Sequence, residues 1–327
     1  MTPGAVIGYE LPDVMLSGRP AALAAGMRAI DAAGVDYLVL PDRPVAAVTA
    51  AAWLATRTSR LALVVTASPA YYEPYNLARM VASLDHISAG RAGWQVSTVP
   101  DAVQDANHRR EGFDPAARRA ERAAEYVPVV RSLWDSWEDG AFRHDKTTGQ
   151  FIDDERIHAV DHAGPELSVR GPFNIIRPPQ GHPVVFAADD SPVAAAADVL
   201  TGGDPGPGRP DPGKPRLLTV LLFLAPTGAQ AAELHARAGT PGNDHRRAVV
   251  VGDPGAVTDR LSAWTGNVDG FTVRFGAESQ VGLFTELVLP RLRTGAPSGT
   301  LTLRQRLGLP RPPSRFARSP ATPIATR

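Results

Sequence analysis

Short apolar runs alternate along the chain with longer segments in which apolar residues recur at helical spacing. Val35–Leu40 and Leu61–Thr66 are predominantly apolar runs, which are typical of parallel strands buried on both faces. Pro20–Ala33 precedes them, with Pro20 suited to a first helical turn and Gly34 to a helix end. A strand and a helix in each stretch of about 30 residues indicate βαβ units and a parallel sheet. Alternation alone does not distinguish a closed barrel from an open sheet.

The same pattern predicts the other regular elements. We expect further strands at Ala5–Leu11, Trp94–Thr98, Pro183–Ala187, the end of Val193–Leu200, Leu217–Ala225, Ala248–Val251 and Val268–Phe275. We expect further helices at Val45–Thr58, Asn76–Ile87, Ala116–Trp137, Gly228–Ala238, Pro254–Trp264 and Val281–Leu292, the last being the final helix. Pro128 should kink or break the helix that contains it, and Asp253 should cap the start of another.

Two segments interrupt the alternation. Residues 140–180 are mostly polar and rich in turn residues, so we expect an insertion of hairpins outside the sheet. Gly202–Pro215 holds five prolines and five glycines, a composition that excludes a helix and predicts a shortened sixth βα unit. We therefore expect a single domain over residues 1–313 and a disordered tail over residues 314–327.

Composition narrows the classes of protein. The chain has 327 residues, with 34 Lys and Arg against 34 Asp and Glu, and this balance predicts neither nucleic acid nor an anionic membrane as a partner. It has no cysteine, so disulfides and thiolate chemistry are excluded. The sequence shows neither a signal peptide nor an apolar run of the roughly 20 residues that span a bilayer. We expect a cytoplasmic protein.

Four segments, in this order, resemble one branch of the luciferase-like flavin-dependent monooxygenases. This branch contains nitrilotriacetate monooxygenase, pristinamycin synthase and dibenzothiophene-sulfone monooxygenase. The segments are EPYNLARMVASLDHISAGRAGW at Glu73–Trp94, ERAAEYVPVVRSLWDSWED at Glu121–Asp139, VRGPFNIIRPPQGHPVV at Val169–Val185, and VDGF at Val268–Phe271 with TLRQRLGLPRP at Thr302–Pro312.

The resemblance implies a (β/α)₈ TIM barrel with the insertion and shortened unit described above. It also implies reduced FMN as cosubstrate, a separate NAD(P)H:flavin reductase, and a homodimer. The reaction it implies is oxygen insertion into, or next to, a C–N or C–S bond of a small organic substrate. In such enzymes the flavin carries the chemistry while the protein supplies binding, orientation and exclusion of water. No catalytic side chain and no metal site is predicted.

Five residues are predicted to bind the flavin, since ligands of this fold lie at the carboxyl ends of the strands. Asp42 follows the second strand, although it could instead be a solvated loop residue. Ser68 follows the third strand, where the resemblance implies a non-proline cis peptide within Thr66–Ser68, the alternative being an ordinary loop start. Gln95 stands where the family has Asn, and its amide can both donate and accept hydrogen bonds. Arg119 and Ser191 are candidates for the flavin phosphate, although Arg119 could instead pair with a Glu on its own helix.

The chain departs from the family pattern around the expected phosphate site. Ala116 and Ala120 replace the His and Tyr of a His-x-x-Arg-Tyr pattern, and Asp189 and Asp190 stand where the family has Gly and its neighbour. A carboxylate within about 5 Å of a phosphate costs a few kcal/mol at an effective dielectric near 20. These replacements leave an alternative open: a flavin-poor barrel that is non-catalytic or that binds the deazaflavin coenzyme F420.

Overall fold

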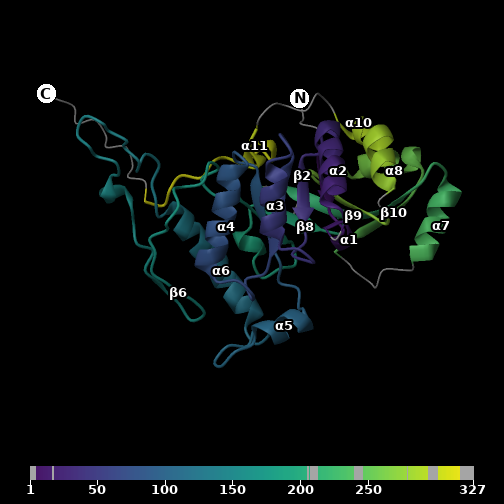
Figure 1. Cartoon of the computed structure of the whole chain (residues 1–327). Coiled ribbons are helices and arrows are strands. Elements are labelled where there is room, and N and C mark those ends of the chain that lie inside the picture. Colours follow the sequence, from purple (N-terminus) through teal and green to yellow (C-terminus); the bar gives the residue numbers. More distant parts are fainter. Residues whose placement is uncertain are drawn as a thin grey trace.

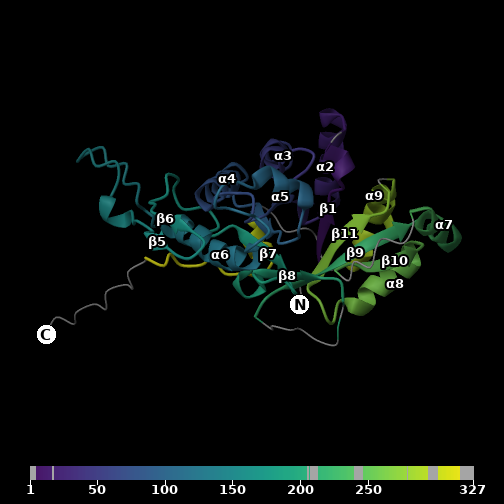
Figure 2. The ribbon, with the colours of Figure 1, turned by 90° about the horizontal axis from the view of Figure 1, so that it is seen from below.

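The computed structural model describes residues 5–16, 18–204, 206, 213–238, 246–277, 279–293 and 301–316. Eight parallel strands close into a ring, because β11 pairs with both β1 and β9 and β8 pairs with β9. The expected (β/α)₈ barrel is thereby confirmed (Figures 1 and 2). The strands of the ring are β1 (Val6–Glu10), β2 (Tyr37–Leu40), β3 (Ala62–Ala67), β4 (Ala92–Val96), β7 (Val184–Ala188), β8 (Val199–Gly202), β9 (Arg216–Leu224) and β11 (Gly270–Phe275).

Helices cover the outside of the ring, and their ends follow the sequence signals. Pro20 opens α2, and Gly34 ends it with a φ of 91°. The Asp253 side chain caps α8 by accepting hydrogen bonds from the Gly255 and Ala256 amides, as predicted. α6 continues through Pro128 as one helix. The covering helices are α2 (Pro20–Ala33), α3 (Ala47–Ala55), α4 (Pro74–Ile87), α6 (Arg119–Asp135), α7 (Gly228–Ala238) and α8 (Pro254–Trp264).

Three short α-helices, α1 (Asp13–Leu16), α5 (Ala102–His108) and α11 (Leu303–Arg306), were not predicted. α1 follows β1, and α5 follows β4. The helix expected over Val281–Leu292 is divided into α9 (Gln280–Leu283), a π-helical turn at Phe284–Val288 and α10 (Leu289–Leu292). It is also not the last helix, because α11 (Leu303–Arg306) follows it.

α11 closes the amino-terminal end of the barrel. Leu303 and Leu307 belong to a small core formed by alternate strand residues, separate from the core between the ring and the helices. Two glycines leave room inside the ring: a Cβ at Gly8 would lie 2.1 Å from the Tyr37 ring, and one at Gly93 would lie 3.0 Å from Leu303. The side chains of this core are Tyr37, Val39, Ala62, Val64, Val184, Phe186, Val199, Leu217, Leu303 and Leu307. The open end of the barrel is therefore the carboxyl-terminal end.

The described part of the sixth βα unit agrees with the shortened unit that the sequence predicts. Between β8 and β9, residues 202–204, 206 and 213–215 contain no helix. β8 pairs with the start of β9, through Leu200 and Arg216. A further strand, β10 (Ala248–Gly252), pairs with the second half of β9, from Val220 to Leu224. β10 therefore begins at the level where β8 ends.

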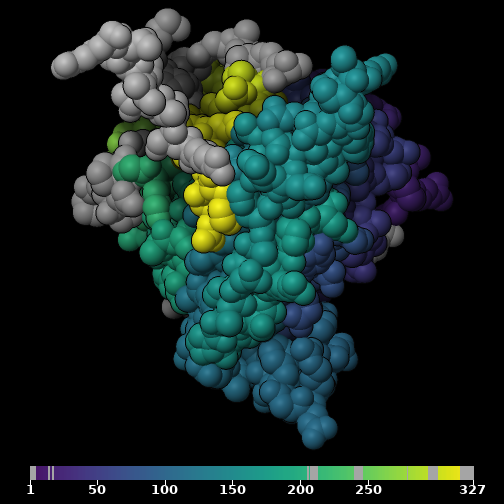
Figure 3. Space-filling view, turned by 90° about the vertical axis from the view of Figure 1, so that its left-hand side faces the viewer, coloured from purple at the N-terminus to yellow at the C-terminus, as the bar shows by residue number. Residues whose placement is uncertain are grey.

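The insertion lies beside the barrel, at the left of Figure 1, and carries short hairpins. β5 (His162–Ala163) pairs with β6 (Ser168–Val169), Phe142 forms a bridge with Ile152, and Asp154–Arg156 is a 3₁₀ turn. Figure 3 shows the yellow C-terminal segment against this teal insertion. Residues 301–316, the described part of the C-terminal segment, are thus packed on the barrel and its insertion.

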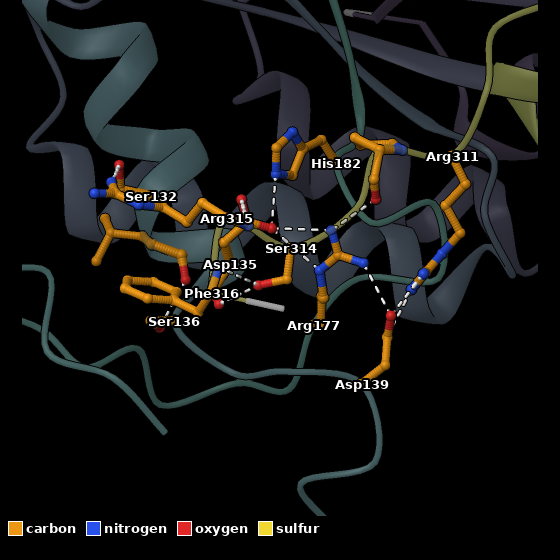
Figure 4. Close-up of polar contacts among 12 residues, drawn as sticks. Ser132, Asp135, Ser136, Asp139, Arg177, His182, Arg311, Ser314, Arg315 and Phe316 are labelled. Carbon is orange, nitrogen blue, oxygen red and sulfur yellow. Dashed lines mark hydrogen bonds and ion pairs between the residues drawn. The ribbon is translucent and has the colours of Figure 1, made fainter. Parts of the chain in front are cut away.

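Part of the expected tail is held by a charged cluster (Figure 4). The Asp135 carboxylate accepts two hydrogen bonds from Arg177 and lies 2.9 Å from Nε2 of His182. Ser314 donates to the Asp135 carbonyl, and the Arg315 amide donates to its carboxylate. The packed chain therefore includes residues 314–316, which we expected in the tail, whereas 317–327 lie outside the described residues.

Asp85 connects several elements at the closed end of the barrel. It accepts hydrogen bonds from the Ala92 amide and from the backbone and side-chain amides of Gln180. The Gln180 side chain also accepts from the Arg304 amide of α11, at 2.8 Å. Burial raises the pKa of Asp85 from 3.8 to about 6, against these hydrogen bonds, which lower it.

This pKa predicts the pH dependence of stability. Because the folded carboxyl group binds its proton more tightly than the unfolded one, its contribution to the free energy of unfolding is largest below about pH 4 and declines up to about pH 6. We expect Asp85→Asn, which removes this titration, to cost more unfolding free energy at pH 4 than at pH 7 in urea denaturation. Asp259→Asn, at an exposed position on α8, is the control. A cost that is equal at both pH values, or larger at pH 7, would contradict the prediction.

Candidate functional site

Two adjoining cavities occupy the open end of the barrel. One, of about 550 Å³, is lined by residues that follow β2, β3 and β4 and by α5. The other, of about 450 Å³, is lined by residues of β3, β4, β7, β8, β9 and β11, including Thr66, Thr201, Thr219 and Thr272. Glu10, Thr66, Gln95, Ser97, Val99 and Arg247 line both. Together they have the size and the mixed apolar and polar lining typical of small-molecule sites.

Three of the five predicted flavin ligands, Asp42, Ser68 and Gln95, line the larger cavity. Asp42 accepts hydrogen bonds from the Ala47 amide at 3.0 Å and from the Tyr72 hydroxyl at 2.7 Å. Burial, and then this bond to Asp42, raises the pKa of Tyr72, so the phenol stays protonated and donates. Asp42 is thus fixed at the start of α3 rather than solvated in a loop.

Gln95 differs from the other two in having an unused amide. It projects from β4 into both cavities and makes no side-chain hydrogen bond to any described residue. Ser68 is buried, and its hydroxyl accepts from the Ala70 amide at 3.3 Å. The amide of Gln95 is therefore well placed to bind a ligand.

The non-proline cis peptide expected within Thr66–Ser68 is not present. Within the described part of the chain, the cis bonds precede Pro44 and Pro172. The expectation came from the resemblance, and it was wrong for this chain.

Arg119 is placed behind the cavity wall. Its guanidinium pairs with Asp105 of α5 and donates to the Tyr71 hydroxyl, and both members of the Arg119–Asp105 pair are 11% exposed. Tyr71 also donates to Asp105, at 2.8 Å. Burial raises the pKa of Asp105, whereas the hydrogen bonds from Arg119 and Tyr71 lower it. Together with the nearby positive charges these bonds outweigh burial, so the pKa lies below its usual value. Arg119 does not line either cavity, and its partner is not a Glu of its own helix.

Ser191 also lies outside both linings. Its hydroxyl is buried 3.4 Å from that of Thr98, which joins the ends of β7 and β4. Asp189 and Asp190 do not line the cavities either. Asp189 pairs with Arg216 at 3.3 Å, and Asp190 with Arg246 at 3.2 Å. The two acidic side chains are therefore partnered by arginines and do not fill the open end of the barrel.

Several lining residues were not identified from the sequence. Tyr71, Tyr72 and His108 form an aromatic wall of the larger cavity, with Tyr71 and His108 4.9 Å apart between ring centroids. Glu10 and Arg247 form an ion pair at 2.8 Å between the two cavities. Glu10 could have been found, since it is the charged residue within the apolar run Ala5–Leu11.

Three histidines of the insertion and of the segment after it lie beside carboxylates. His158 lies 2.7 Å from Glu138, His162 2.6 Å from Glu125, and His182 is held in the Asp135 cluster. Over the described ranges, no group of three His, Cys, Asp or Glu side chains could hold a metal ion. None of the helices in these ranges is long and apolar enough to cross a membrane.

The geometry defines a class, the (β/α)₈ barrels that bind a small molecule at the carboxyl ends of their strands. The chain belongs to the luciferase-like monooxygenase family, whose model matches residues 3–202. It is 35% identical over 301 residues to one of the subunits of pristinamycin IIA synthase from Streptomyces pristinaespiralis, a match that covers 89% of this chain and 90% of that one. The family is one of flavin-dependent monooxygenases.

Other relatives match over shorter lengths. Nitrilotriacetate monooxygenase component A from Aminobacter aminovorans is 46% identical over 151 residues, which are 46% of this chain and 33% of that protein. The chain thus spans about a third of that relative. The crystal structure of DmoA from Hyphomicrobium sulfonivorans superposes with a TM-score of 0.77 at 19% identity, covering 93% of this chain and 92% of that one. This likeness shows the fold alone.

The pairing of Arg119 with Asp105 can be tested by stability. Asp105→Asn leaves a sheltered guanidinium without its carboxylate, and we expect a loss of about 2 kcal/mol in unfolding free energy. Glu233→Gln, which removes an exposed pair with Arg237, is the control and should cost less than about 0.5 kcal/mol. Equal costs in chemical denaturation would show that Arg119 is not held in this way.

Proposed function

We propose that this chain is a monooxygenase that uses reduced FMN and O₂ to oxidise a small organic substrate at, or next to, a C–N or C–S bond. The observation that carries the proposal is the open end of the barrel. It offers two adjoining cavities of about 550 and 450 Å³ in a chain of the luciferase-like monooxygenase family. Two compartments suit a reaction in which a flavin and a substrate must be held together.

The lining fits the ring system of a flavin. Gln95 supplies an amide that can donate to or accept from the polar edge of the ring, and Ser68 and Asp42 lie along the same cavity. The apolar part of the lining, which includes Val39, Ala67 and Val99, excludes water from a bound ring. We assign Asp42, Ser68 and Gln95 to the flavin, while contacts of Arg119 and Ser191 with it stay predictions.

Bound reduced flavin would activate O₂, and the protein would bind, orient and shield the reactants. Tyr71, Tyr72 and His108 line the larger cavity and do not line the smaller one, to which Thr201, Thr219 and Thr272 contribute. We therefore assign this aromatic side to the substrate. Aromatic faces suit an organic molecule with an apolar or planar part.

The proposal includes a second protein. Reduced flavin has to be supplied, so we infer an NAD(P)H:flavin reductase as partner. The name "component A" of the Aminobacter relative supports an enzyme of more than one component. We further propose a homodimer, in keeping with the family resemblance.

A second candidate is a flavin-poor barrel, either a non-catalytic subunit or a binder of coenzyme F420. The placement of Arg119 and Ser191 outside the cavities favours it, because both were expected at the flavin phosphate. The Streptomyces relative is named as one subunit of a synthase, which is compatible with such a role. Flavin binding separates the two candidates.

We expect reduced FMN, titrated anaerobically, to bind with submillimolar affinity and to quench tryptophan fluorescence. Gln95→Leu should weaken binding about tenfold by removing a hydrogen-bonding amide that has no described partner in the protein. Gln150→Leu, at an exposed position of the insertion, is the control. If the folded protein binds no flavin at millimolar concentration, the monooxygenase proposal fails. Coenzyme F420 is then titrated in the same way.

A further inference from the structure

Helix α5 forms part of the wall of the larger cavity and is held in place at two points. The Asp101 side chain caps its start by accepting hydrogen bonds from two backbone amides of the first turn, both at 3.1 Å. Asp105, in its middle, pairs with Arg119 of α6. His108 ends the helix and lines the larger cavity but not the smaller one. The backbone that carries His108 is therefore fixed beside the side of the site assigned to the substrate.

A hydrogen bond to its own helix determines the tautomer of His108. Its Nδ1 atom lies 2.9 Å from the Gln104 carbonyl oxygen, one turn earlier on α5. Because a carbonyl oxygen only accepts hydrogen bonds, the proton of the neutral imidazole is on Nδ1 and Nε2 carries a lone pair. The ring also packs on that of Tyr71, with 4.9 Å between the centroids, which restricts its rotation.

The Nε2 atom of His108 is a hydrogen-bond acceptor with no partner among the described residues. It lies across the ring from Nδ1 and thus points away from the helix backbone. In His158 and His162, by contrast, Nε2 lies beside a carboxylate of the protein. A half-buried acceptor that lines a cavity is available to a donor group of the ligand.

The charges of the larger cavity favour a positively charged partner for this acceptor. In the described part of the chain, the lining holds four carboxylates and two guanidinium groups: Glu10, Asp13, Asp42, Asp101, Arg43 and Arg247. Each arginine pairs with one of these carboxylates, at 2.9 and 2.8 Å. Asp42 is instead held by two neutral donors, the Ala47 amide and the Tyr72 hydroxyl. Its negative charge and the faces of the tyrosine rings both attract a cation.

We propose that His108 selects substrates that carry a protonated amine with an N–H group, from which Nε2 accepts a hydrogen bond. The inference rests on the proposed function, because it places the substrate of that reaction against the wall formed by Tyr71, Tyr72 and His108. An alcohol could also donate to Nε2, but it lacks the charge that the surplus of carboxylates attracts. An amine substrate also agrees with oxidation at, or next to, a C–N bond.

The tautomer is tested on the wild-type chain. Proton–nitrogen NMR spectra of the full chain, labelled with the heavy nitrogen isotope at its histidines, distinguish rings protonated on Nδ1 from rings protonated on Nε2. The signals that disappear in His108→Phe belong to His108. At mildly alkaline pH we expect its proton on Nδ1 and a bare Nε2.

Two matched cations test recognition of the N–H group. N,N-dimethylbenzylammonium has one N–H group, and benzyltrimethylammonium has a methyl group in its place. In ligand-observed NMR titrations at the same pH, we expect the wild-type chain to bind the first about tenfold more tightly. His108→Phe keeps an aromatic ring against Tyr71 but removes the acceptor, so it should lose this difference.

His235→Phe is the matched control. His235 lies in the last turn of α7, with its ring 4.7 Å from that of Phe223 between centroids, and it lines neither cavity. This variant should keep the tenfold difference between the two cations. Circular dichroism and the midpoint of urea denaturation establish that each variant is folded.

Each result decides for or against the inference. A bare Nε2, with a preference for the N–H cation that only His108→Phe loses, supports it. The inference is overturned if Nε2 carries the proton, if the wild-type chain binds both cations equally or binds neither, or if both variants lose the preference. Reduced FMN is titrated against the same preparations. If FMN binds in any of these cases, the proposed function survives; if the folded wild-type chain binds no FMN, the proposed function fails and the inference falls with it.

Discussion

The hydrogen bonds that close eight parallel strands into a ring determine where every candidate ligand contact lies. Parallel strands bring all their carboxyl ends to one rim, so residues far apart in sequence meet there. Glu10 of β1, Gln95 of β4 and Thr272 of β11 line one cavity only because β11 pairs back with β1. The pairing of β8 and β10 with successive parts of β9 completes the same rim on the other side.

The two ends of the ring differ: the amino-terminal end is closed by packed side chains, and the carboxyl-terminal end holds the cavities. At the amino-terminal end, α11 inserts Leu303 and Leu307 among strand side chains, and Arg304 binds Asp198 and the His182 carbonyl. This end is sealed and serves stability. At the carboxyl-terminal end, polar side chains such as Gln95 remain accessible from the cavities, which is where binding energy can be gained from a ligand.

Local signals in the sequence predicted most regular elements, because they act over a few residues. Pro20, Gly34 and Asp253 mark helix ends that the structure reproduces. α11 was missed because four residues are too short for a helical period, although Thr302 and Gln305 form a capping box that could have revealed it. The ring closure itself followed from the family resemblance, since alternation does not distinguish a barrel from an open sheet.

The candidate site was less predictable, for a physical reason. Position on a strand end located Asp42, Ser68 and Gln95, since the strand determines where they point. The environment of Arg119 depends on α5, which supplies Asp105, and no pattern in the sequence revealed that pairing. Arg247 reaches the site only through the register of β10 against β9, which spacing along the chain does not encode.

The central claim is that the open end of this barrel binds a flavin nucleotide. A crystal structure of the chain with FMN tests it most directly. We predict that the flavin ring lies beside Ser68 and Gln95. A structure in which FMN lies outside these cavities, or in which crystals grown with saturating FMN contain none, would contradict it.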